Sequence, residues 1–155
     1  MEPERAVAPP SADLDLITAA AVDAGRVAMR FFRAECAQWE KEADAGPVSE
    51  ADLAVNTLLM DRLSAARPDY GLLSEETEDD GSRARADRVF IIDPIDGTRA
   101  FLRGETGFAV AIAVVERGEV ISSVVHLPAR GETYAAERGL GARLNGALIR
   151  PSDRR

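Results

Sequence analysis

The chain has 155 residues, with 27 acidic and 19 basic side chains, and its formal net charge is −8. A net negative surface excludes proteins that hold a nucleic-acid polymer or an anionic membrane through a basic face. Hydrophobic residues make up 46% of the chain, which contains one cysteine and one histidine. This is the composition of a globular domain without disulfides or a zinc cluster, and we predict a cytoplasmic protein.

The pattern of a targeting signal or of a transmembrane helix is not found in the sequence. Residues 1–10 contain three prolines and charged side chains in place of the apolar stretch of a signal peptide, so we expect a flexible tail. The longest apolar run, residues 108–115, has eight residues, less than half of what spans a bilayer. We therefore predict one folded domain over residues 11–152.

Two helices are predicted in the first half. Apolar residues recur at intervals of three and four between Ser11 and Phe32, the helical period, and Ser11 is a favourable N-cap. The stretch Ser49-Glu50-Ala51-Asp52 matches a capping box, and the helix that it starts is expected to end before Pro68. Between them a polar stretch ends in Gly46-Pro47, which predicts a turn.

After the second helix the apolar pattern becomes that of strands. A buried strand is predicted to stop at Pro94, and a hairpin is predicted at Arg117-Gly118. The glycines between 139 and 146 interrupt a tail with no strong period. The strands are expected over residues 70–74, 88–93, 108–116, 119–127 and 133–136. The fold class is therefore α+β, with N-terminal helices packed on a mostly antiparallel sheet.

The most specific motif is Asp93-Pro94-Ile95-Asp96-Gly97-Thr98. A buried strand here delivers two carboxylates, three residues apart, into a Gly-Thr turn. Gly97 lets the backbone approach a ligand closely, and the amides of Gly97 and Thr98 at the start of a helical turn can face an anion. Carboxylates for a divalent cation next to amides for phosphate oxygens are what metal-assisted phosphoryl chemistry needs.

The pair Glu75-Glu76 supplies further carboxylates upstream of this motif. Like charges about 4 Å apart repel by about 1 kcal/mol in water and by more in a protein, so converging carboxylates require a cation. Hard oxygen ligands point to Mg²⁺, with Mn²⁺ or Ca²⁺ as alternatives. The remaining acids at 78–80 are interpreted as a solvated loop, and His126 and Cys36 as structural residues.

Two other classes of acidic site share part of this pattern but do not fit it. Haloacid-dehalogenase-like phosphatases also place an acidic motif after a buried strand, but their carboxylates are two apart, whereas Asp93 and Asp96 are three apart with Pro94 between them. An EF-hand calcium loop needs an alternating ladder of Asp or Asn and a distal Glu, and both are missing.

These motifs together resemble the inositol monophosphatase family, the lithium-sensitive, Mg²⁺-dependent phosphatases that include bisphosphate nucleotidases. The resemblance covers about residues 12 to 152 and implies the sugar-phosphatase-like N-terminal half of a layered αβαβα fold. It is carried by Glu75-Glu76, the stretch from Asp93 to Thr98 with Phe101, Lys41, residues 48–52, residues 139–142 and residues 144–146.

The resemblance implies a set of metal ligands. Glu75, Asp93 and the Ile95 carbonyl would hold the first ion, Asp93 and Asp96 the second, and Glu75 would contribute to a third, weaker ion. Two to three Mg²⁺ ions are therefore expected, with Mn²⁺ possible as a substitute. Family members continue into a second domain that brings another aspartate to the second ion, and this domain is expected to be absent here because the sequence stops at Arg155.

The resemblance also implies catalytic roles. Asp52 and Thr98 match the pair that activates a water, with Glu76 supporting them, while the Gly97 and Thr98 amides hold the phosphate. Lys41 is a possible further site residue.

From these assignments we expect Mg²⁺-dependent hydrolysis of a small phosphate monoester such as inositol 1-phosphate. The alternative substrate is 3′-phosphoadenosine 5′-phosphate. The alternative from another class is a catalytically weak half-enzyme that binds metal or a partner chain. A homodimer is expected from the family.

Overall fold

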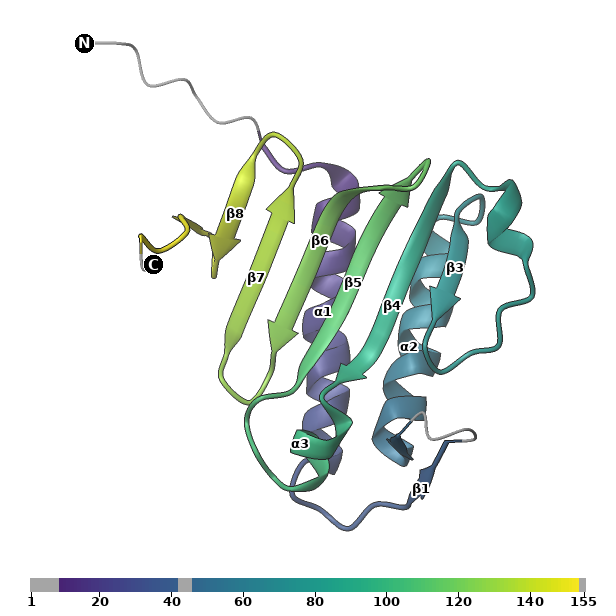
Figure 1. Ribbon diagram of the computed structural model, residues 1–155, viewed down its shortest axis with the longest axis vertical. Coiled ribbons are helices and arrows are strands. Elements are labelled where there is room, and N and C mark those ends of the chain that lie inside the picture. Colours follow the sequence, from purple (N-terminus) through teal and green to yellow (C-terminus); the bar gives the residue numbers. More distant parts are fainter. Residues whose placement is uncertain (1–8, 42–45, 154–155) are drawn as a thin grey trace.

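Both predicted helices form, and they lie on one face of a large sheet (Figure 1). The computed structural model describes residues 9–41 and 46–153. Ser11 caps the first helix by accepting a hydrogen bond from the Leu14 amide, and Ser49 caps the second through the predicted capping box. The helices are α1 (Ala12–Phe31), α2 (Glu50–Ala66), α3 (Thr98–Leu102) and the 3-10 turn η2 (Ser82–Arg85).

In the described residues seven strands form one sheet in the order β3-β4-β5-β6-β7-β8-β9. Strands β3 and β4 run parallel, whereas the other neighbours are antiparallel. A separate hairpin pairs β1 (Gln38–Glu40) with β2 (Pro47–Ser49). The sheet strands are β3 (Gly71–Ser74), β4 (Arg88–Asp96), β5 (Ala109–Glu116), β6 (Glu119–Leu127), β7 (Glu132–Glu137), β8 (Gly141–Leu144) and β9 (Ala147–Ile149). The predicted α+β class is confirmed.

The prediction that Pro94 stops its strand is wrong, because β4 continues to Asp96. The pairing of β4 with β5 shifts its register between Asp93 and Asp96, so the proline lies in an irregular part of the ladder. A bulge tolerates proline because no ladder hydrogen bond from its nitrogen is needed there. Because of this irregularity, the side chains of Asp93 and Asp96 do not follow the regular alternation of the strand.

The sequence did not predict two of the strand pairs. The tail that shows no strong period forms β8 and β9, which are only four and three residues long and are joined by Asn145-Gly146 at φ 47° and 86°. An Asn-Gly turn with both φ values positive is the preferred two-residue hairpin connection, and this was the available signal. The polar stretch with its predicted turn forms the β1–β2 hairpin, although residues 42–45 lie outside the described residues.

The core lies between the two long helices and the central strands. Its members are apolar residues of both helices and of β4 to β6, including Ile17, Leu59, Phe90, Ile112 and Val124. His126 extends this layer: its ring approaches the backbone of Gly25 in α1, and its Nδ1 lies 2.9 Å from the Thr133 hydroxyl. Burial lowers the pKa of His126. The structural interpretation of His126 agrees with these contacts.

The other face of the sheet carries no α-helix in the described residues, and Figure 1 shows its central strands uncovered. The 3-10 turn η2 packs against Gly71 of the edge strand β3. Strand alternation places Ile91 on this face, because Phe90 and Ile92 on either side of it are buried beneath the helices. Ile91 is 42% exposed, and Val125 of β6 is 39% exposed. The described part of the chain also contains no helix that is long and apolar enough to cross a membrane.

A buried ionic cluster joins α1 to the loop after α2 and to β4. The Asp13 carboxylate is 2.9 Å from Arg67 Nε and 2.8 Å from a guanidinium nitrogen of Arg88, and it accepts a 2.7 Å hydrogen bond from the Tyr70 hydroxyl. Burial raises the pKa of Asp13, but the hydrogen bonds from Tyr70 and the two arginines outweigh burial and the pKa is lowered. This cluster lies apart from the carboxylates predicted to bind metal and is a structural feature.

Candidate metal and phosphate site

Most of the predicted site residues line one pocket of about 210 Å³. It lies where β4 ends and α3 begins, beside the β1–β2 hairpin. Its lining consists of Lys41, Gly46, Pro47, Glu75, Asp93, Ile95, Asp96, Gly97, Thr98 and Arg99. Two predicted residues do not line it. The Asp52 carboxylate accepts a hydrogen bond from the Thr98 hydroxyl, and the Glu76 carboxylate forms an ion pair with Lys41. The pocket thus collects residues from three separate stretches of the chain.

The Thr98 hydroxyl links this pocket to the first turn of α2. It donates to Asp52 Oδ1 at 2.9 Å and lies 3.1 Å from the Ile95 carbonyl oxygen. The second carboxylate oxygen of Asp52 accepts hydrogen bonds from the Ser49 amide at 2.8 Å and from the Ser49 hydroxyl at 2.6 Å. Asp52 is fully buried, so both carboxylate oxygens are held by the protein itself. The capping interpretation and the proximity to Thr98 are therefore both correct.

Lys41 bridges the two glutamates that follow β3. Its Nζ lies 2.7 Å from Glu76 Oε1 and 3.3 Å from Glu75 Oε1. Burial raises the pKa of Glu76, and the Lys41 ammonium lowers it in part. Burial lowers the pKa of Lys41, but hydrogen bonding and charge attraction from Glu76 and Glu75 outweigh burial and the pKa is raised. The ammonium therefore offsets one of the two acidic charges at this edge of the pocket.

Asp93 is the site carboxylate with an uncompensated oxygen. Its Oδ1 is buried and has no hydrogen-bond partner among the described residues. Burial, together with the nearby carboxylates of Glu75, Asp96 and Glu76, raises the pKa of Asp93 to about 7. A buried carboxylate surrounded by other carboxylates is costly unless a cation or a proton neutralises it.

The carboxylates share a pocket but do not form a ready-made ligand cage. Among the described residues, no three Asp, Glu, His or Cys side chains are grouped closely enough to hold a metal ion. Glu75 and Glu76 both face the Lys41 ammonium through their Oε1 atoms. Lys41 therefore competes with a bound cation for Glu75.

Gly97 fixes the path of the chain through the site. Its φ is +82°, in the left-handed region, and a Cβ there would lie 3.1 Å from the Gly107 carbonyl oxygen. The predicted helical turn follows as α3, which is anchored by Phe101 packing edge-on against Phe108, with ring centroids 4.9 Å apart. Backbone freedom at Gly97 and a core anchor at Phe101 together direct the start of α3 into the pocket.

A polar network supports the loop that carries Glu75 and Glu76. It was not predicted from the sequence. The Ser74 hydroxyl donates to Asn56 Oδ1 at 2.6 Å, and Asn56 Nδ2 donates to the Thr77 hydroxyl at 2.9 Å. The Glu76 amide in turn donates to Ser74 Oγ at 3.3 Å. The available sequence signal for this network was Asn56, a polar residue on the apolar face of the second helix.

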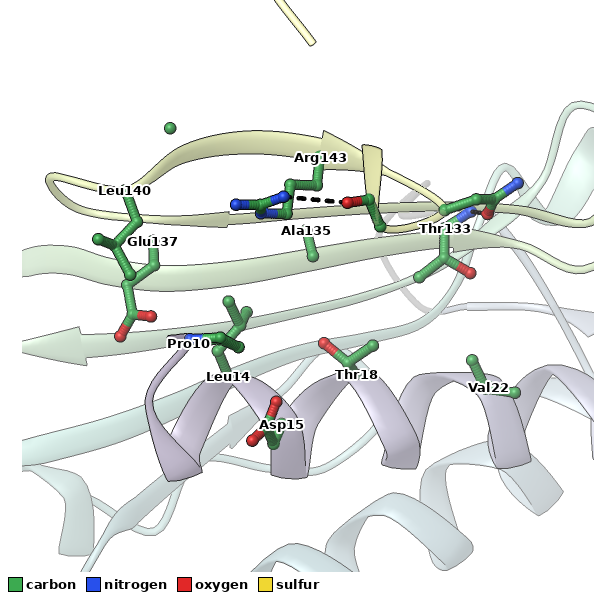
Figure 2. Close-up of a pocket in the computed structure, with 13 residues that line it drawn as sticks. Pro10, Leu14, Asp15, Thr18, Val22, Thr133, Ala135, Glu137, Leu140 and Arg143 are labelled. Carbon is green, nitrogen blue, oxygen red and sulfur yellow. Dashed lines mark hydrogen bonds between the residues drawn. The ribbon is translucent and has the colours of Figure 1, made fainter. Parts of the chain in front are cut away.

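A larger, more apolar hollow of about 300 Å³ lies elsewhere, between α1 and the strands β7 and β8 (Figure 2). Figure 2 shows Leu14, Thr18 and Val22 of α1 facing Ala135 and Arg143 across it. None of the predicted metal ligands lines this hollow. The chemistry-bearing residues therefore identify the smaller pocket as the candidate site.

Comparison with known proteins assigns the chain to a family. The model of the inositol monophosphatase family matches residues 12–155. The chain belongs to the inositol monophosphatase family. The resemblance based on the acidic motifs and Gly97-Thr98 is thus confirmed, and the match includes every residue predicted for the site.

Two relatives and one solved structure illustrate the likeness within the inositol monophosphatase family. A histidinol-phosphatase of Chlorobaculum parvum is 39% identical over 140 residues, which are 90% of this chain and 53% of that protein. An inositol-1-monophosphatase of Rhizobium meliloti is 38% identical over 146 residues, 94% of this chain and 54% of that protein. The crystal structure of the extragenic suppressor protein suhB from Bartonella henselae has a TM-score of 0.87 and 36% identity, covering 94% of this chain and 56% of that one. The chain spans about half the length of these relatives.

Proposed function

We propose that residues 11–152 form the metal- and phosphate-binding domain of a Mg²⁺-dependent phosphomonoesterase. The observation that carries this proposal is the buried, unpartnered Oδ1 of Asp93, in a pocket that also contains Glu75 and Asp96. An oxygen in that position is stabilised by a cation. The donors near it are all hard oxygens, which fit Mg²⁺ and also Mn²⁺.

Glu75, Asp93 and the Ile95 carbonyl are the proposed ligands of a first ion, and Asp93 and Asp96 those of a second. Glu75 is the proposed contributor to a third. A bound divalent cation supplies charge neutralisation, polarises the phosphoryl group and lowers the pKa of a water. The pocket has room for a cation and a phosphate side by side, since its volume is about 210 Å³.

The proposed proton transfer uses the chain's own Thr98 and Asp52. The Thr98 hydroxyl proton is directed at the Asp52 carboxylate, 2.9 Å away, so the hydroxyl oxygen can accept a proton from the attacking water. The water oxygen forms a bond to phosphorus as the bond from phosphorus to the ester oxygen breaks. One proton of the water moves to Thr98 and the Thr98 proton moves to Asp52, while the ester oxygen leaves with the bonding electron pair and takes up a proton from solvent water. Ser49 holds Asp52 in place. Glu76, whose carboxylate forms an ion pair with Lys41, is the proposed supporting carboxylate.

The phosphate is proposed to lie against the amides of Gly97 and Thr98, beside the carboxylates. The substrate class is a small phosphate monoester, and inositol 1-phosphate is the leading candidate, because relatives at 38% identity are named inositol-1-monophosphatases. The relative named histidinol-phosphatase, at 39% identity, makes a second small alcohol phosphate worth testing. The bisphosphate 3′-phosphoadenosine 5′-phosphate remains the alternative substrate.

Phosphate release by the 155-residue chain tests the proposal. The three substrates are incubated with and without Mg²⁺, and with Li⁺ as an inhibitor. We expect turnover of at least one substrate that depends on Mg²⁺ and falls with Li⁺. Turnover that is unchanged when Mg²⁺ is chelated would contradict the metal assignment.

The second candidate is a half-enzyme that binds Mg²⁺ or a partner chain without appreciable turnover. It is favoured by one observation: a face of the sheet exposes Ile91 and Val125. Calorimetry with Mg²⁺ and sedimentation of the chain alone separate the candidates. Mg²⁺ binding with no turnover, together with a homodimer or larger assembly, supports the half-enzyme.

A further inference from the structure

Arg99 lines the candidate pocket but has no role in the mechanism above. It is the second residue of α3, directly after Thr98. Phe101, two residues later, is buried in the core, and two helical residues correspond to a rotation of roughly 200°. The core anchor therefore turns the Arg99 side chain away from the protein interior and toward the pocket.

The guanidinium has a defined neighbour on the opposite wall of the pocket. A Cβ built on Gly46 would meet an Arg99 guanidinium nitrogen at 3.5 Å. This is an ordinary van der Waals distance, so the guanidinium lies close to the Gly46 backbone. Arg99 thus spans the pocket mouth from α3 to the β1–β2 hairpin.

The pocket contains one other cationic side chain in its described lining, Lys41. Lys41 is held by Glu75 and Glu76, whereas no described carboxylate lies within ion-pair distance of Arg99. A guanidinium offers several N–H donors in one plane and matches two phosphate oxygens at once. Arg99 follows Thr98 directly and lines the same pocket as Gly97 and Thr98, so its side chain belongs to the site in which their amides would hold a phosphate.

We propose that the Arg99 guanidinium binds phosphoryl oxygens of the substrate through paired N–H donors, and so is a substrate-binding residue of this site. The inference rests on the proposed function, because it requires the phosphate to lie at Gly97 and Thr98. Arg99 lines the same pocket as the carboxylates of Glu75, Asp93 and Asp96. Its charge also offsets the acidic lining that would otherwise repel a phosphate.

Inorganic phosphate is the probe, titrated into the full chain in the presence of Mg²⁺ and followed by calorimetry and ³¹P nuclear magnetic resonance. The variants are Arg99→Gln, which removes the charge, and Arg99→Lys, which keeps the charge but removes the planar fork. Arg103→Gln is the matched control, since this arginine is the C-cap residue of the same short helix, its side chain is 70% exposed, and it does not line the pocket. Thermal unfolding of each variant verifies that the fold is unchanged.

We expect Arg99→Gln to weaken phosphate binding about tenfold, as for the loss of a hydrogen bond between charged groups, and Arg99→Lys to recover only part of the loss. Arg103→Gln binds as the wild type does. If the wild type binds phosphate and Arg99→Gln binds it equally well, the inference is wrong while the proposed function stands. Full binding by Arg99→Lys contradicts the paired contact, and absence of binding in the wild type contradicts both proposals.

Discussion

The Thr98 hydroxyl donates a 2.9 Å hydrogen bond to a fully buried carboxylate, that of Asp52, 46 residues earlier in the chain. The bond joins the start of α3 to the first turn of α2. The same carboxylate closes the capping box with Ser49, so its position is set by the helix that it begins. A proton acceptor is thereby held in a fixed place behind the pocket.

The first prediction is that substitutions of Thr98 and Asp52 lower the activity far more than the stability. We expect Thr98→Val and Asp52→Asn each to lower kcat for Mg²⁺-dependent phosphate release by about 10²-fold or more, because each interrupts the proton transfer. Thr98→Ser keeps the hydroxyl and most of the activity. Asp52→Asn costs about 1 kcal/mol of unfolding free energy through the weakened cap. Full activity in Thr98→Val would exclude the hydroxyl from the mechanism.

A second prediction concerns the pH dependence of stability. The pKa of Asp93 is raised by burial and by neighbouring carboxylates from 3.8 to about 7, so between these values the folded state holds a proton that the unfolded state has lost. The contribution of Asp93 to stability is therefore greatest below pH 3.8 and is lost as the pH rises toward 7. In metal-free buffer, we expect Asp93→Asn to gain stability relative to the wild type over this window, by about 1–2 kcal/mol at its upper end.

The same variant has the opposite effect when Mg²⁺ is added. Wild-type protein gains stability because the cation binds the ionised carboxylate, whereas Asp93→Asn gains little. Denaturant unfolding at several pH values, with and without Mg²⁺, measures both effects. A wild type and an Asp93→Asn variant with parallel pH profiles and equal Mg²⁺ responses would show that Asp93 is not a cation ligand.

The sequence predicted the fold class and several of the residues that line this pocket. The residues from Asp93 to Thr98 are local in sequence, and the capping box at Ser49 is also a local signal, so both could be recognised in isolation. The ion pairs of Lys41 could not be predicted, because the sequence of a polar stretch does not show which charged side chains lie near it in the fold. Arg99 and Gly46 were missed as pocket residues for the same reason: they lie across from one another only after α3 and the hairpin have formed.

The third prediction tests the buried ionic cluster of Asp13. We expect Asp13→Asn to lower the unfolding free energy by about 2–3 kcal/mol, since it leaves Arg67 and Arg88 without their shared carboxylate. Glu119→Gln is the control, because in its ion pair with Arg138 the two side chains are 62% and 63% exposed and the pair contributes at most about 1 kcal/mol. The lowered pKa of Asp13 means that its contribution is present above pH 3.8 and is lost as the pH falls further. Equal losses in both variants would contradict the assignment.

The fourth prediction separates backbone strain from close approach at Gly97. Gly97→Ala and Gly118→Ala both place a side chain at positive φ, +82° and +83°, but a Cβ meets the Gly107 carbonyl oxygen at 3.1 Å in the first case and nothing within 4 Å in the second. We expect Gly118→Ala to cost about 1–2 kcal/mol. Gly97→Ala costs more and also weakens phosphate binding, because the start of α3 must shift. Indistinguishable unfolding midpoints would show that the contact with Gly107 relaxes freely.

The last prediction concerns the uncovered face of the sheet. Ile91 and Val125 are 42% and 39% exposed there, and an exposed apolar face favours association with a second copy or another chain. We expect the 155-residue chain to self-associate and to bind a hydrophobic dye, and the double variant Ile91→Lys with Val125→Lys to reduce both. Leu148→Lys is the control, because Leu148 is 55% exposed but strand pairing through Arg143 places it on the face that bears the helices. Sedimentation velocity at matched concentrations measures the difference. A dimer that persists in the double variant but dissociates in Leu148→Lys would assign the interface to the other face, because only a side chain within the contact can disrupt it.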